Sequence, residues 1–184
     1  MLKKGFYLVL IFFITISCFN NKIKEIKDFS FEKLKTTQTS SQVNSNYLEG
    51  VSPIDLEVFL LEKNFQKINN QENSDKDISL KQFIFSETEA NYKIVINGNE
   101  KIKKIEFYSK SETNPLGSAK VFFTKASKIP IPQIDTLRIK KWTEHNINLI
   151  TEKFSKATIL ANIHYIIEQL SSSEYRLTIK KYQG

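Results

Sequence analysis

Apolar residues recur at every second position on both sides of an Asn97-Gly98 dipeptide. Such alternation is typical of strands that bury one face, and Asn-Gly is the preferred pair for a type I′ turn. The pattern therefore predicts an antiparallel hairpin over residues 91–109, with Lys104 and Glu106 on the face opposite the apolar one. The residues expected on the apolar face are Tyr92, Ile94, Ile96, Ile105 and Phe107.

A helix is predicted from Ser52 to about Asn64, ahead of this hairpin. Ser52 suits the N-cap and Pro53 the first helical position. Leu56, Phe59 and Leu60 fall on one face at helical spacing. We expect a short strand at 65–68, a solvated loop at 69–79 and a further strand at 80–86.

Two more helices are expected after the hairpin. Residues 114–117 form a turn, and Ser118 is expected to cap a helix that Pro130 and Pro132 terminate. Asp135 is expected to cap another helix that reaches about Asn146. The buried face of the first of these helices would comprise Ala119, Phe122, Phe123 and Ala126.

The segment 158–170 fits both a strand and a helix. Its β-branched and aromatic residues favour a strand, which would form a closing hairpin with 175–179. Sequential strands joined by turns then pair antiparallel, with helices over one face. The expected fold class is α+β, a two-layer sandwich with a mainly antiparallel sheet and helices on one face, formed by residues 51–184.

The N-terminal segment has the pattern of an export signal. Lys3 and Lys4 precede an apolar run, 6–16, that is shorter than the ~20 residues of a membrane-spanning helix. The run is followed by Ser17-Cys18, which resembles the lipobox of bacterial lipoproteins. Thr15 stands where leucine is usual, so the resemblance is to the relaxed lipobox that is familiar in Bacteroidota. The resemblance implies cleavage before Cys18, its acylation, and anchoring to a membrane of the cell envelope, expected to be the outer membrane.

Two alternatives to lipidation stay open. An ordinary signal peptidase could cut after Ser17, or the segment could remain as an uncleaved anchor. Downstream, residues 18–50 are expected to form a flexible tether, since 36–46 is polar and nearly free of apolar side chains. Within that range, 23–34 interleaves apolar residues with lysines and could instead form a short amphipathic helix on the bilayer surface. Export would exclude nucleic acid as a routine partner.

Motifs of catalysis and cofactor binding do not assemble from this sequence. Its 184 residues contain five glycines, too scattered for a phosphate-binding loop, and one cysteine. His145 and His164 lack the spacing of metal ligands. The loop Asp75-x-Asp77 departs from calcium loops, because the required glycine and glutamate are absent. We therefore expect no cofactor, no metal and no catalytic residues.

Two weaker motifs remain. Glu87 and Glu89 could act as an acid/base pair but have no supporting motif. Asp135-Thr136-Leu137 resembles the short O-glycosylation signal of Bacteroidota, in competition with the helix cap that Asp135 offers.

Charge is distributed unevenly along the chain. Residues 18–100 carry ten basic and thirteen acidic side chains, a net charge of −3, whereas residues 101–184 carry fifteen and seven, a net charge of +8. Basic clusters attract anionic headgroups, acidic glycans or acidic proteins, although they also serve solubility. The candidate contacts to such a partner are Lys103, Lys104, Arg138, Lys140, Lys141, Trp142, Lys180 and Lys181.

Two functions are consistent with these patterns. The first is a non-catalytic envelope lipoprotein that binds or scaffolds an envelope partner or an anionic component. The second is a small envelope enzyme or enzyme inhibitor whose site is built from scattered residues. A cleft with converging, strongly perturbed titratable groups would favour the second function, and a flat or hydrophobic exposed sheet face would favour the first.

Overall fold

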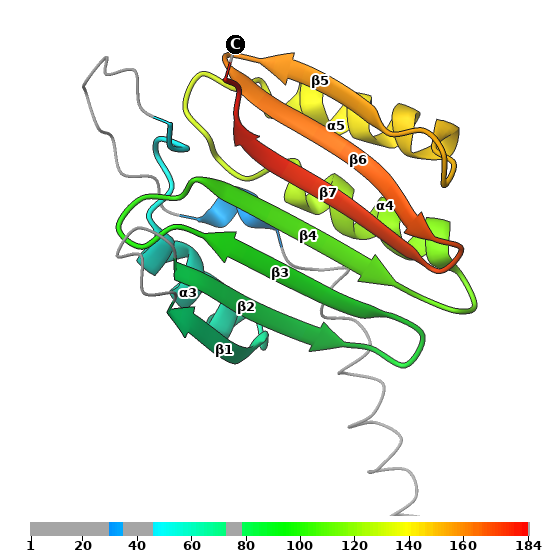
Figure 1. Ribbon diagram of the computed structural model, residues 1–184, viewed down its shortest axis with the longest axis horizontal. Helices are drawn as coiled ribbons and strands as arrows, with labels where there is room; N and C mark the ends of the chain where they lie inside the picture. The colour runs from blue at the N-terminus through cyan, green and yellow to red at the C-terminus, as the bar shows by residue number, and fades with distance from the viewer. Residues whose placement is uncertain (1–29, 35–45, 73–78, 184) are drawn as a thin grey trace, which may run out of the picture.

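Seven antiparallel strands form one sheet in the computed structural model, which describes residues 30–34, 46–72 and 79–183 (Figure 1). The strand order across the sheet is β1-β2-β3-β4-β7-β6-β5. The strands are β1 (Gln66–Glu72), β2 (Ser79–Ser86), β3 (Asn91–Asn97), β4 (Lys104–Lys110), β5 (Lys156–Leu160), β6 (Ile163–Ser171) and β7 (Glu174–Lys181).

Helices cover one face of this sheet and leave the other face, here called the open face, without helices (Figure 1). They are α3 (Pro53–Glu62), α4 (Pro115–Ala126) and α5 (Thr136–Asn146), with short 3-10 turns η1 (Phe31–Lys33) and η2 (Ile147–Leu149). The expected α+β two-layer sandwich is confirmed.

The two halves of the sheet meet where β4 pairs with β7. Each half is a helical segment followed by consecutive antiparallel strands. The strand order of the second half is reversed across the sheet, so its last strand, β7, lies next to β4, the last strand of the first half. The pairing extends from Lys104 opposite Lys180 to Lys110 opposite Glu174. It therefore brings together two stretches of the chain that are far apart in sequence.

The core lies between the sheet and the helices. Alternate strand residues point into it, including Ile94 and Phe107, which are fully buried. Phe122 of α4 contacts Tyr92 and Phe107, with ring centroids 4.7 and 5.9 Å apart. The alternation predicted for 91–109 and the buried faces predicted for the helices at 53 and 118 are confirmed.

Helix starts agree with the sequence at two of three positions. Ser52 Oγ accepts from the N–H groups of Ile54 and Asp55, and Asp135 Oδ1 accepts from those of Leu137 and Arg138. The third helix starts earlier than predicted. Its cap is Asn114 rather than Ser118, because Asn114 Oδ1 accepts from the N–H of Gly117 at 3.1 Å and Pro115 fits the first turn.

The predicted type I′ turn at Asn97-Gly98 is wrong. A longer connection over 98–103 joins β3 to β4, closed by a hydrogen bond from the Lys103 N–H to the Asn97 carbonyl at 2.8 Å. The connection turns inward to bury Ile102, which pairs with Leu48. Burial of this isoleucine explains why the chain does not turn at once.

The ambiguous segment 158–170 is β structure, as favoured, but it is two strands rather than one. Ala161 and Asn162 both have positive φ, 45° and 62°, and form the tight turn between β5 and β6. Consequently Ile159 is 44% exposed, whereas Ile163 joins the core. The predicted closing hairpin is the pair β6 and β7.

Residues ahead of the predicted domain start at 51 belong to the packed structure. Phe31 is fully buried, and its ring lies 5.4 Å from that of Phe59 and 5.7 Å from that of Phe107. Leu34 and Leu48 are buried as well. The prediction of a tether over 18–50 is therefore wrong for 30–34 and 46–50, and the rest of that range lies outside the described residues. Likewise, β1 extends to Glu72, into the predicted loop.

Candidate functional site

A basic hollow opens at the end of the sheet where β4 begins and β7 ends. Its volume is about 460 Å³. Four lysines and one histidine contribute to its wall, and the described residues that line it include no carboxylate. The lining residues are Asn46, Lys103, Lys104, His164, Lys180, Lys181, Tyr182 and Gln183.

Strand register aligns three of these side chains in one row across β4, β7 and β6. Lys104 lies opposite Lys180, and Lys180 lies opposite His164. All three have the strand parity of the open face, since their neighbours Ile105, Ile179 and Ile163 are buried. Directly opposed residues have Cβ atoms ~5 Å apart, and like charges so placed lower stability. The row therefore concentrates positive charge at a cost to the stability of the fold.

Ion pairing offsets little of this charge. Lys104 Nζ lies 3.2 Å from a carboxylate oxygen of Glu106, which adjoins the hollow on the same strand. Glu106 is 8% exposed and also lies 3.6 Å from Arg176 Nη1. Lys180 and Lys181 form no ion pair with any residue in the described part of the chain.

Backbone hydrogen bonds hold the two chain segments that flank the row. The Lys103 N–H is held by the Asn97 carbonyl, and Lys103 Nζ lies 5.8 Å from the ring centre of Tyr47. The Tyr182 N–H donates to the Asn162 carbonyl at 2.7 Å. These hydrogen bonds fix the backbone at Lys103 and next to Lys181, both of which line the hollow.

His164 and Tyr182 form the aromatic side of the hollow. Their rings meet edge to face, with centroids 5.8 Å apart and an interplanar angle of 87°. Burial, and then the positive charge of Lys180, lower the pKa of His164 below its ordinary value. The imidazole is therefore neutral at pH 7, and it offers one N–H donor to a ligand.

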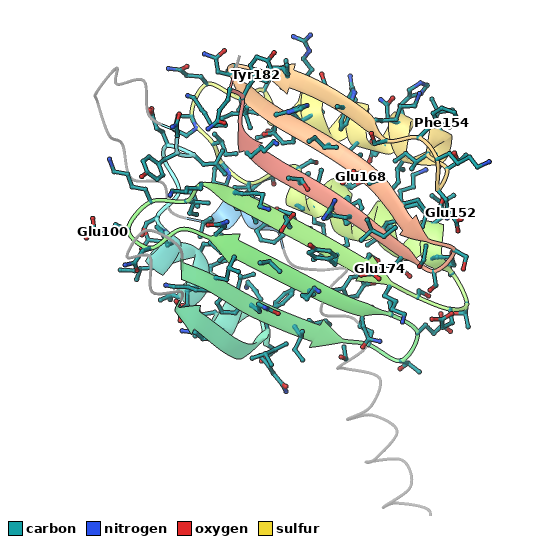
Figure 2. The ribbon with its side chains drawn as sticks, viewed as in Figure 1. Glu100, Glu152, Phe154, Glu168, Glu174 and Tyr182 are labelled. Carbon is teal, nitrogen blue, oxygen red and sulfur yellow. The ribbon has the colours of Figure 1, made fainter. Side chains whose placement is uncertain are left out.

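The middle of the open face is neutralised by its own side chains. Arg176 Nη2 and Nε donate to Glu168 at 2.7 and 3.0 Å. Tyr108 lies between two cations, with Lys93 Nζ 4.2 Å and Arg176 Cζ 6.0 Å from its ring centre. Figure 2 shows Glu168 on β6 in this central region and Tyr182 at the far end of the sheet. Lys180 and Lys181, which have no ion pair among the described residues, lie toward the end of the sheet that carries Tyr182.

The predicted basic residues of α5 do not reach the hollow. That helix lies on the covered face, where Trp142 is partly buried against the core. Lys140 Nζ lies 3.8 Å from Glu144, and Arg138 and Lys141 are exposed. The structure thus brings together Lys103, Lys104, Lys180 and Lys181 from the sequence prediction and separates from them Arg138, Lys140, Lys141 and Trp142.

Among the described residues, the structure assembles no site for the other chemistry considered from the sequence. The described residues include no group of three or more metal-binding side chains, and none of their helices is long and apolar enough to cross a membrane. Glu87 accepts a hydrogen bond from the Tyr92 hydroxyl at 3.4 Å. Cys18, Asp75 and Asp77 lie outside the described residues.

Comparison with protein-family models, curated proteins and solved structures finds no match to this chain.

Sequence reasoning missed four members of the hollow: Asn46, His164, Tyr182 and Gln183. The strand alternation did place His164 on the polar face, away from Ile163 and Tyr165. The alternation could not show that Lys180 lies opposite His164, because that neighbour is identified only by the register of β6 against β7. Tyr182 follows the last strand, where no periodic pattern remains.

Proposed function

We propose that this protein is a membrane-anchored envelope lipoprotein whose domain binds an anionic envelope component without catalysing a reaction. The observation that carries the proposal is the basic hollow. Four lysines meet there, and one of them has a carboxylate partner among the described residues.

Electrostatics favour this function over a purely solubilising role for the lysines. Solubilising charges are best spread and mixed with acidic residues, as they are in the centre of the open face. At physiological ionic strength the Debye length is ~8 Å, so charges cooperate on a ligand when they lie close together. Lys104 and Lys180, opposite each other on adjacent strands, meet this condition.

The anchor part of the proposal depends on Cys18 and the resemblance of 15–18 to a relaxed lipobox. Two or three acyl chains would hold the protein at a membrane surface, because each buried methylene contributes ~0.8 kcal/mol. A basic site on a membrane-bound domain would then bind anionic lipids, acidic glycans or acidic proteins of the envelope.

The test compares two double variants of the full chain that remove the same charge from different layers. Lys180→Gln/Lys181→Gln alters the hollow, and Lys140→Gln/Lys141→Gln alters α5. Purified protein in a non-ionic maltoside micelle is titrated with heparin, as a soluble polyanion, and with micelles that contain phosphatidylglycerol, at low and high salt.

We expect salt-sensitive binding that the hollow variant loses and the α5 variant keeps. Equal weakening of both variants would show that net charge alone attracts the ligand and would overturn the proposal. Absence of binding by wild-type protein to either polyanion at low salt would also overturn it.

A further inference from the structure

The hollow differs from a general anion-binding surface in the kind of cations it gathers. Lys103, Lys104, Lys180 and Lys181 present ammonium groups, and its described lining includes no arginine. Arg176, on the same strand as Lys180, is held by Glu168 and Glu106. A guanidinium fork matches carboxylate and phosphate alike with two parallel hydrogen bonds, whereas a lysine is a mobile point charge, so a site made of lysines selects an anion mainly by its charge.

We propose that the hollow binds a phosphomonoester group, an inference that rests on the proposed anion-binding function. A phosphomonoester carries about −1.5 to −2 charge at pH 7 and three terminal oxygens. A carboxylate or a phosphodiester carries one negative charge and offsets less of the repulsion between Lys104 and Lys180.

The geometry of the row suits one tetrahedral group. Lys104, Lys180 and His164 occupy three adjacent strands, and neighbouring strands are ~4.8 Å apart. Long lysine side chains from the two strands β4 and β7 can converge on separate oxygens of one phosphate, with the His164 N–H as a further donor.

The remaining space accommodates the group that carries the phosphate. A volume of about 460 Å³ lies within the range of ligand sites, ~300–1,000 Å³. Tyr182, 41% exposed, and His164 provide a wall with both apolar and polar atoms. A sugar phosphate or a lipid headgroup with a terminal phosphate would offer the same chemistry to this site.

The two histidines of the chain provide a reporter and an internal control. His164 lines the hollow between Lys180 and Tyr182, whereas His145 is exposed in the last turn of α5 on the other layer. A dianion bound beside His164 stabilises its protonated form and must raise its pKa. The resonances of His145 should not respond to the ligand.

The experiment follows the imidazole resonances of the untagged full chain by NMR, in maltoside micelles, over a pH titration. The soluble probes are inorganic phosphate, glucose 6-phosphate, dimethyl phosphate and acetate. Phosphatidic acid and phosphatidylglycerol in mixed micelles represent lipid sources with a terminal and with a bridging phosphate. Lys180→Gln and Lys141→Gln are the matched variants.

We expect inorganic phosphate and at least one monoester to raise the pKa of His164, with no ligand-dependent change in the resonances of His145. Dimethyl phosphate and acetate should bind more weakly. Loss of one lysine should lower phosphate affinity about fivefold in Lys180→Gln and leave it unchanged in Lys141→Gln. A stronger response to phosphatidic acid than to glucose 6-phosphate identifies a lipid source, and the reverse identifies a soluble or glycan source.

The outcomes separate this inference from the function on which it rests. If acetate or dimethyl phosphate matches the monoesters, or if heparin binds through the hollow while no phosphate shifts His164, the phosphomonoester assignment is wrong and anion binding stands. If no probe binds, both are wrong.

Discussion

At the scale of single residues, Phe31 joins a segment before the first long helix to the core. Its side chain is fully buried against Phe59 and Phe107. Truncation of a buried phenylalanine removes apolar contacts and leaves a cavity, which costs ~3–5 kcal/mol. Phe31→Ala should therefore lower the free energy of unfolding by about that amount in chemical denaturation.

The neighbouring residue provides the control for Phe31. Glu32 is exposed, and its carboxylate lies 3.0 Å from Lys128 Nζ. Surface ion pairs contribute ~0–1 kcal/mol, so Glu32→Ala should have a small effect. A similarly small effect of Phe31→Ala would mean that this segment does not pack on the domain in solution.

Tyr165 carries a hydroxyl that the core does not satisfy. The residue is fully buried, and its hydroxyl has no hydrogen-bond partner among the described residues. Burial also raises its pKa, so the phenol stays neutral at every working pH. An unsatisfied buried polar group costs ~1–3 kcal/mol, and Tyr165→Phe should raise the midpoint of denaturation by removing it.

Tyr92 is the matched comparison for Tyr165. It is also buried, but its hydroxyl donates to Glu87 at 3.4 Å. Tyr92→Phe should be neutral or destabilising in the same assay. An equal gain in both variants would show that the tyrosine hydroxyls are disfavoured irrespective of their partners.

At the scale of elements, two connections should respond in opposite directions to substitution. Gly98 has φ of +135°, and a Cβ there would lie 2.0 Å from the Lys101 carbonyl oxygen. Gly98→Ala should lower the free energy of unfolding by more than ~1 kcal/mol.

Ala161 has φ of +45°, a region that asparagine tolerates better than alanine. Ala161→Asn should therefore raise the free energy of unfolding by up to ~1 kcal/mol.

Thermal unfolding of both variants against wild type measures this difference. A loss of stability in Ala161→Asn would mean that the turn between β5 and β6 does not need positive φ. Tolerance of alanine at position 98 would mean that the connection over 98–103 can move away from Lys101.

The strands and helices were predictable to the extent that each has one buried face. The alternation of Tyr92, Ile94 and Ile96 depends on local sequence alone, and so do the caps at Ser52 and Asp135. The turn at Asn97-Gly98 was not predictable, since its form depends on the contact of Ile102 with Leu48, which comes from another segment. The segment 158–170 is divided into two strands by the turn at Ala161 and Asn162. This turn was not predictable because it contains no glycine, the residue that usually indicates a tight turn.

The candidate site was predictable in composition and not in assembly. Lys103, Lys104, Lys180 and Lys181 were identified as basic clusters from their positions in the chain. Their convergence depends on the pairing of β4 with β7, two strands far apart in sequence. No local pattern distinguished them from the basic residues of α5, which the fold places on the other layer.

At the scale of the whole molecule, the proposed attachment to the envelope would depend on Cys18. If Cys18 is acylated, Cys18→Ala should release the protein from washed membranes or leave its precursor unprocessed. The measurement is fractionation with metabolic labelling by a palmitate analogue, and the wild-type chain should carry the label. Unchanged membrane association and migration of Cys18→Ala would contradict lipidation and favour an uncleaved anchor.

The charge distribution of the molecule predicts that the lysines of the basic hollow lower the stability of the free protein while they favour anion binding. The formal net charge of the chain is +7, and Lys104 and Lys180 lie directly opposite each other. Lys180→Gln removes this repulsion and should raise the free energy of unfolding by ~0.5–1 kcal/mol at low salt. High salt screens the repulsion, because the Debye length falls to ~3 Å at 1 M, and the gain should then shrink.

Phosphate should make the wild-type protein more stable than Lys180→Gln, the reverse of their order without ligand. A ligand that binds the folded state stabilises it in proportion to its occupancy, so inorganic phosphate should raise the melting temperature of wild type more than that of Lys180→Gln. Lys141→Gln, which removes the same charge from exposed α5, should behave as wild type in both conditions. If Lys141→Gln gains as much stability as Lys180→Gln, net charge rather than the opposed pair is responsible. The hollow would then impose no cost on the fold that ligand binding has to offset.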